Sequence, residues 1–137
     1  MRTILRADQA NLVNASIRAV GREDNALSYA PEPAFSVVLY LNQPTTAEGT
    51  AAMRRLTSDL IDLCLREGGR FFLPYQLHYT PAQLARSYPE IGTFFAAKRS
   101  WDPKGLFSNT WYARYAPFFA KQPAAMRPSM TAGAPKA

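Results

Sequence analysis

The segment from residue 45 to residue 83 constrains the fold most, because start and stop signals for two helices follow one another closely within it. Thr45 lies three residues before Glu48, which is the spacing of a capping box and predicts the beginning of a helix. Apolar residues then recur at helical spacing as far as residues 68–69 (Gly-Gly), a pair that accepts the left-handed conformation in which helices end. Residues 80–83 (Thr-Pro-Ala-Gln) form a second capping box with proline at the first helical position. We therefore expect a long helix with a sharp end and a second helix soon after it.

The strand signals lie on both sides of the long helix. Residues 14–20 alternate between polar and apolar side chains, with Ser16 and Arg18 on the polar side, which predicts a strand with one wet or functional face. Residues 35–41 are β-branched and aromatic and predict a central strand, and residues 70–73 predict a short third strand. The expected fold class is α+β, a small, mostly antiparallel sheet with helices on one face. Such a thin sheet has two open edges, which favours a chain that is part of something larger.

Two weaker helix signals follow. Pro89 is expected to begin a helix that turns Ile91, Phe94 and Phe95 inward. The pair at residues 102–103 (Asp-Pro) repeats the cap-and-proline signal and predicts another helical start before residues 106–107.

Composition divides the chain of 137 residues into three parts. Residues 1–11 are a polar lead that could be the end of a helix. Residues 12–121 are expected to form one domain, for which the chain is long enough. Residues 122–137 are rich in Pro, Ala, Met, Ser and Gly and are expected to be a disordered tail.

The net charge of +6 belongs to the last third of the chain. Before Lys98 there are nine Lys or Arg and nine Asp or Glu, whereas from Lys98 onward there are seven basic residues and one acid. The basic end is either a solvated tail or a surface for an anionic partner, such as a flavin domain or a phosphorylated substrate. A nucleic-acid partner is not expected, because no recognised binding motif accompanies the charge.

Several classes of protein are excluded by what the sequence lacks. There is no apolar run of about eighteen residues, so no transmembrane segment is expected. The first residues lack the apolar stretch of a signal peptide, which favours a cytoplasmic location. Cys64 is the only cysteine, so neither an internal disulfide nor a zinc site built on cysteine pairs can form.

The order and spacing of several segments resemble a known family. These segments are residues 13–18 (VNASIR), 27–30 (LSYA), 56–62 (LTSDLID), 68–81 (GGRFFLPYQLHYTP) and 98–107 (KRSWDPKGLF). Together they resemble the C-terminal substrate (cap) domain of FAD-linked oxidases of the vanillyl-alcohol-oxidase type. The likeness covers roughly residues 12–116 and is closest to the alditol, aldonolactone and decaprenylphosphoryl-ribose oxidase branches.

The resemblance implies part of a FAD-dependent oxidoreductase that acts on a CH–OH group of a sugar, polyol or lactone, with hydride transfer to flavin N5. FAD would be held mainly by a separate FAD-binding domain or subunit, because the glycines of this chain form no phosphate-binding loop. The other expected partner is a small polyhydroxylated substrate. The polypeptide alone is expected to be flavin-free and inactive, whether it is a gene fragment, a split subunit or a truncation. The alternative is a non-catalytic α+β binding module.

Two residues are candidates for catalysis. Arg18 matches a substrate-side arginine of the alditol-oxidase branch, where a guanidinium could orient a substrate oxygen and stabilise negative charge. Its alternative role is a surface arginine paired with an acid. Tyr75 stands where several relatives have a lysine. A phenol has an unperturbed pKa of about 10 and needs a nearby positive charge to act as a base near neutral pH. Tyr75 could instead only hydrogen-bond the substrate or pack its ring.

Three more residues are candidates for substrate binding. Ser36 and Val38 would face the same way on a regular strand, as a hydrogen-bonding wall and an apolar wall of the pocket. Phe72 matches an aromatic position near the flavin, and its alternative role is in the core.

The remaining reactive residues are given structural roles. His78 is the only histidine and suits proton transfer, but a surface or interdomain contact is favoured. Cys64 is expected to be buried and inert. No metal site is expected. Interdomain packing is expected for Asp102, Phe107, Asn109 and Trp111.

Overall fold

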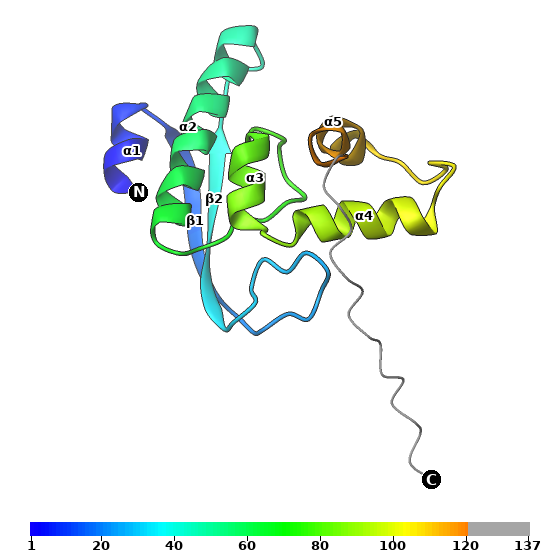
Figure 1. The fold of residues 1–137 in the computed structure, drawn as a ribbon. Helices are drawn as coiled ribbons and strands as arrows, with labels where there is room; N and C mark the ends of the chain where they lie inside the picture. The colour runs from blue at the N-terminus through cyan, green and yellow to red at the C-terminus, as the bar shows by residue number, and fades with distance from the viewer. Residues whose placement is uncertain (121–137) are drawn as a thin grey trace. The chain divides into compact units, whose positions relative to one another are not determined.

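The computed structural model describes residues 1–120 and has an α+β fold (Figure 1). The chain divides into two compact units, the first from Met1 to Ile91 and the second from Gly92 onward. The predicted tail, residues 122–137, lies outside the described residues. The elements are α1 (Arg2–Ala7), β1 (Asn11–Val20), β2 (Ala34–Asn42), α2 (Ala47–Arg66), α3 (Pro81–Ser87), α4 (Ile91–Trp101) and α5 (Thr110–Phe119).

The sheet of the described chain is a single antiparallel hairpin of β1 and β2. The predicted α+β class, the antiparallel pairing and the first two strands are confirmed. The prediction of a third strand at residues 70–73 is wrong, because this segment forms no strand. The backbone of this segment forms hydrogen bonds with side chains and not with a neighbouring strand. The Phe71 N–H donates to Ser87 Oγ at 3.4 Å, and the Phe71 carbonyl accepts from the Tyr88 hydroxyl. These bonds satisfy the backbone groups that a neighbouring strand would otherwise pair with.

The apolar face of the hairpin is largely exposed. Residues directly opposite each other in an antiparallel pair point to the same face. Ile17 is opposite Val37 on the apolar face, where Ile17 is 72% exposed and Phe35 is 79% exposed. Ser16 is opposite Val38 on the other face, and both are half-buried. Arg18, on the same polar face, is exposed. The structure therefore leaves most of the apolar face open, while the polar face is partly covered and partly exposed.

Helix α2 is the long helix expected from the capping signals. Its N-cap is Thr46, one residue later than predicted, and Thr46 Oγ1 accepts from the Gly49 N–H at 3.1 Å. Leu56 and Ile61 are its buried residues. The helix ends as expected, because Gly68 has a φ of +74°, which costs little only for glycine.

Helix α3 begins with the predicted capping box, and α2 lies between α1 and α3 (Figure 1). Thr80 Oγ1 accepts from the Gln83 N–H at 3.1 Å, and the Gln83 side-chain oxygen accepts from the Thr80 N–H at 3.0 Å. The Gln83 side chain also donates to the Ser58 carbonyl at 3.1 Å and to Ser58 Oγ at 2.9 Å. The same buried side chain therefore caps α3 and attaches it to α2.

The second unit has an aromatic core formed by α4 and α5. Phe95 is fully buried, with the Trp111 ring stacked at 5.3 Å and the Phe119 ring stacked at 5.4 Å. The inward position predicted for Phe95 is confirmed. Helix α4 begins at Ile91, two residues after the predicted start at Pro89.

The predicted helical start at Asp102 is wrong. The Asp102 carboxylate accepts from the Leu106 and Phe107 backbone N–H groups, each at 2.9 Å. These bonds close a turn in place of a helix. The next helix, α5, begins later, with Asn109 as its N-cap.

Candidate functional site

Three of the five predicted site residues lie together on the hairpin. Arg18 on β1 is directly opposite Ser36 on β2, and Val38 lies two residues along the same face. Arg18 is exposed, whereas Ser36 and Val38 are half-buried. None of the ion pairs within residues 1–120 involves Arg18, so no described acid takes up its charge. The hairpin thus presents a guanidinium beside a hydroxyl, two groups that can hydrogen-bond an oxygen-rich molecule.

The other two predicted residues lie on the segment between α2 and α3. The rings of Phe72 and Tyr75 meet edge-on with centroids 5.4 Å apart, and Tyr29 meets Phe72 in the same way at 5.0 Å. Tyr75 is 66% exposed. Over residues 1–120, no lysine or arginine makes a hydrogen bond or a cation–π contact with Tyr75. The described chain therefore brings no positive charge into direct contact with Tyr75.

These two groups of residues are not joined to each other. Across the described residues, no hydrogen bond, ion pair or ring contact links Arg18 or Ser36 to Phe72 or Tyr75. Neither Arg18 nor Tyr75 lines either of the two cavities described below.

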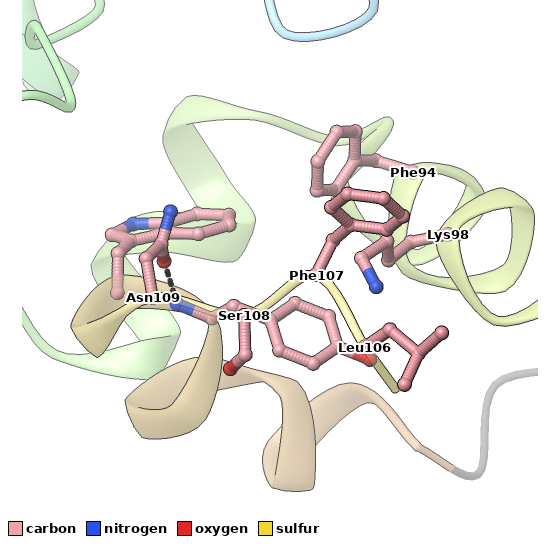
Figure 2. A pocket seen from close by; sticks show the side chains of 8 residues that line it. Phe94, Lys98, Leu106, Phe107, Ser108 and Asn109 are labelled. Carbon is pink, nitrogen blue, oxygen red and sulfur yellow. Dashed lines mark hydrogen bonds between the residues drawn. The ribbon is translucent and has the colours of Figure 1, made fainter. Parts of the chain in front are cut away.

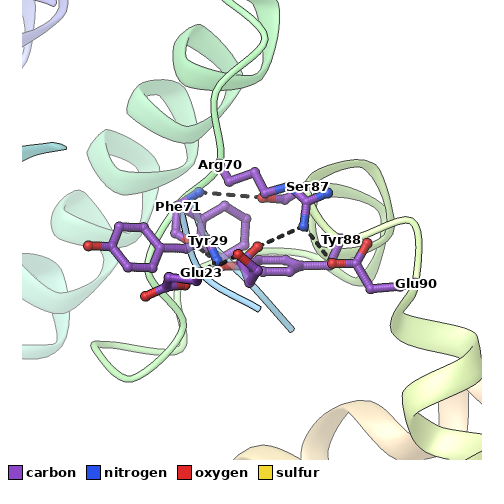
Figure 3. A network of polar contacts seen from close by, with 8 residues as sticks. Glu23, Tyr29, Arg70, Phe71, Ser87, Tyr88 and Glu90 are labelled. Carbon is purple, nitrogen blue, oxygen red and sulfur yellow. Dashed lines mark hydrogen bonds and ion pairs between the residues drawn. The ribbon is translucent and has the colours of Figure 1, made fainter. Parts of the chain in front are cut away.

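A polar network that the sequence analysis missed fixes the loop between β1 and β2 (Figure 3). Glu23 Oε2 accepts from the Tyr29 N–H at 3.1 Å and from the Ser28 hydroxyl at 3.3 Å. Arg70 Nη1 donates to the buried Ser28 carbonyl at 2.7 Å and also pairs with the Glu90 carboxylate. Single charged residues far apart in sequence carry no spacing signal, which is why the network could not be foreseen.

Beside this network lies a cavity of about 180 Å³ in the first unit. Tyr88, fully buried after the end of α3, forms part of its wall. Burial raises the pKa of the Tyr88 hydroxyl well above its usual range, so this group stays neutral. The residues that line the cavity are Glu23, Asn25, Leu27, Tyr29, Phe72, Leu73, Pro74 and Tyr88.

A second cavity, of about 380 Å³, lies within the second unit (Figure 2). Its wall contains Lys98, whose ammonium pairs with the Asp102 carboxylate and lies 4.7 Å from the centre of the Tyr112 ring. The hydrogen bond from Lys98, together with those from the Phe107 and Leu106 backbone, lowers the pKa of Asp102 to about 2. Lysine and aspartate therefore neutralise each other at this cavity.

The residues predicted for interdomain packing gather around the second cavity. Phe107, Asn109 and Trp111 line it, and Asp102 holds the turn that leads into it.

Of the other reactive residues, Cys64 is half-buried, and burial raises the pKa of its thiol, in agreement with an inert role. His78 is half-buried next to the start of α3.

The start of α2 is not shaped as a phosphate cradle. A phosphate cradle needs free backbone N–H groups at a glycine-rich helix start. Gly49 lies in the first turn of α2, but the space above it is filled, because a Cβ built there would lie 2.3 Å from the Pro44 carbonyl oxygen.

Metal and membrane sites are also missing from the part of the chain that the structure describes. No group of three His, Cys, Asp or Glu side chains within residues 1–120 could hold a metal ion. None of the described helices is both long and apolar enough to span a membrane.

No protein-family model, no curated protein and no solved structure matches this chain. The likeness to FAD-linked oxidases therefore remains a prediction from the sequence segments.

Proposed function

We propose that this chain is the substrate (cap) domain of a FAD-dependent oxidoreductase that acts on a CH–OH group of a sugar, polyol or lactone. FAD belongs to a separate domain or subunit in this proposal. The observation that carries it is the open apolar face of the hairpin, where Ile17, Phe35 and Val37 are exposed side by side. A two-stranded sheet is marginally stable alone, and a contiguous exposed apolar patch is typical of an interaction surface. These features support a domain completed by a partner.

The polar face of the hairpin has groups suited to a polyhydroxylated substrate. The Arg18 guanidinium only donates hydrogen bonds, whereas the Ser36 hydroxyl can donate or accept them. Val38 offers an apolar wall beside them. Arg18 would orient the substrate and stabilise negative charge on its oxygen. Phe72 and Tyr75 would contribute from the segment between α2 and α3.

The alternative is a non-catalytic binding module that docks through the same apolar face. What favours it is that no hydrogen bond, ion pair or ring contact joins Arg18 to Tyr75 in residues 1–120, and that neither residue lines either of the two cavities described above. Both proposals require a partner, but only the oxidase requires flavin chemistry. Reduction of the flavin by a polyol, sugar or lactone in a reconstituted complex therefore discriminates between them.

The test is to purify the chain alone and together with a candidate FAD-binding-domain protein. The oxidase proposal expects a colourless chain alone, a yellow complex that co-elutes, and bleaching of the flavin band by a polyol without oxygen. Phe35→Ser should abolish co-elution, while Arg18→Ala should leave co-elution intact and slow the bleaching. A yellow, active preparation of the chain alone would contradict the proposal. A complex that no polyol, sugar or lactone reduces would favour the binding module.

A further inference from the structure

The cavity of the first unit combines one carboxylate with several aromatic rings. Its wall comes from three stretches of chain: the β1–β2 loop, residues 72–74, and Tyr88 after α3. Glu23 is the only charged residue that lines it. Tyr29, Phe72 and Tyr88 supply the rings, and the first two meet at an interplanar angle of 68°.

The Glu23 carboxylate keeps one oxygen available. Its Oε2 atom is occupied by the Tyr29 N–H and the Ser28 hydroxyl, whereas Oε1 accepts no hydrogen bond from residues 1–120. The nearby guanidinium of Arg70 does not neutralise Glu23, because it is ion-paired with Glu90. The lining therefore has a net negative charge that no described cation balances.

We propose that this cavity binds a small organic cation, an ammonium head group with methyl or methylene substituents. Aromatic ring faces attract such cations through the ring quadrupole, and quaternary ammonium groups are recognised in this way. The free oxygen of Glu23 adds a direct charge attraction. A volume of about 180 Å³ corresponds to roughly six water molecules at about 30 Å³ each, which suits a compact head group and not a whole cofactor.

The rings do not contribute equally. The Arg70 guanidinium already lies 5.3 Å from the centre of the Tyr88 ring. A second cation at that ring would meet like-charge repulsion, so the bound cation is placed against Glu23 and Tyr29. This site shares Phe72 with the residues proposed to contact the substrate, but it uses neither Arg18 nor Ser36 and does not depend on the proposed function.

The experiment is a titration of the full chain with choline, followed by isothermal calorimetry and by amide shifts in NMR spectra. The expected result is saturable binding with a Kd on the order of 1 mM, with shifts centred on residues 23–29. The neutral analogue of choline, in which carbon replaces nitrogen, should bind at least about tenfold more weakly, which corresponds to about 1.4 kcal/mol.

Two variants locate the site. Glu23→Gln removes the charge but keeps an oxygen that can accept from the Tyr29 N–H, and it should weaken choline binding about tenfold. Tyr29→Leu removes the ring and leaves Glu23, with a similar expected loss. Glu32→Gln is the matched control, because it removes an exposed carboxylate from the same loop and should leave binding unchanged.

Three outcomes overturn the proposal: no saturable choline binding to the unmodified chain, equal binding of the neutral analogue, or unchanged affinity in Glu23→Gln. Amide spectra of each variant verify the fold. Should Glu23→Gln unfold the loop, Tyr29→Leu and the neutral analogue still decide the question.

Discussion

Replacing Arg70 by methionine tests whether the polar network holds the first unit together. The Arg70 side chain is 19% exposed and bonds both to the carbonyl of the buried Ser28 and to Glu90. Methionine keeps much of the apolar stem but removes every donor. The Ser28 carbonyl would lose a charged donor, and the half-exposed Glu90 would lose its counter-charge while regaining water.

The expected cost follows from these two contacts. A hydrogen bond to a charged group contributes about 1.5 to 3 kcal/mol. The ion pair adds about 1 kcal/mol at most, because Glu90 is 34% exposed and its charge is partly screened by solvent. Arg70→Met should therefore lower the free energy of unfolding by about 2 to 4 kcal/mol.

The assay is urea unfolding followed by circular dichroism, with a double-mutant cycle of Arg70→Met and Glu90→Gln. A coupling energy of about 1 kcal/mol is expected for residues in direct contact. Arg86→Met is the control, because Arg86 and Asp62 are 3.8 Å apart and both largely exposed, so the loss should stay within about 0.5 kcal/mol. The reasoning is refuted if Arg70→Met costs no more than Arg86→Met.

Three further predictions concern other parts of the chain. Phe95→Ala should destabilise the second unit by about 3 to 5 kcal/mol in thermal unfolding, because a fully buried ring leaves a cavity between Trp111 and Phe119; a loss below about 1 kcal/mol would argue against the stacked core. Gly49→Ala should cost about 1 to 3 kcal/mol, because its Cβ would meet the Pro44 carbonyl, while Gly21→Ala, with nothing within 4 Å, should be neutral in the same urea assay. The pKa of Asp102 is lowered from 3.8 to about 2, so its contribution to stability is complete above about pH 4 and is lost as the pH falls towards 2. Asp102→Asn should flatten that acid slope in unfolding curves, and an unchanged slope would contradict the assignment.

The sequence predicted those features that depend on local chemistry. The capping box at Thr80, the glycine stop at Gly68 and the two long strands are all present, because each depends on residues a few positions apart. The strand predicted at residues 70–73 is absent because Phe71 makes tertiary hydrogen bonds with Ser87 and Tyr88 in place of strand pairing. Aromatic content alone does not distinguish a segment paired in a sheet from a segment held by side-chain hydrogen bonds.

The candidate site was only partly predictable for the same reason. Alternation correctly placed Ser36 and Val38 on one face of β2, since the side-chain period of a strand is two, but it did not give the register that sets Arg18 opposite Ser36. It did not indicate which face would be covered, because that depends on how distant segments pack. The contacts of Glu23 with Ser28 and Tyr29, and of Arg70 with Glu90, depend on the same packing and leave no periodic trace in the sequence.

The double role of Gln83 has a consequence for how α3 forms. A helix of seven residues is too short to persist by itself in water. Because one amide side chain both starts this helix and binds Ser58 of α2, the helix and its attachment should appear and disappear in a single step. Hydrogen exchange of the α3 amides should consequently follow the detachment of α3 from α2, without separate fraying of its first turn.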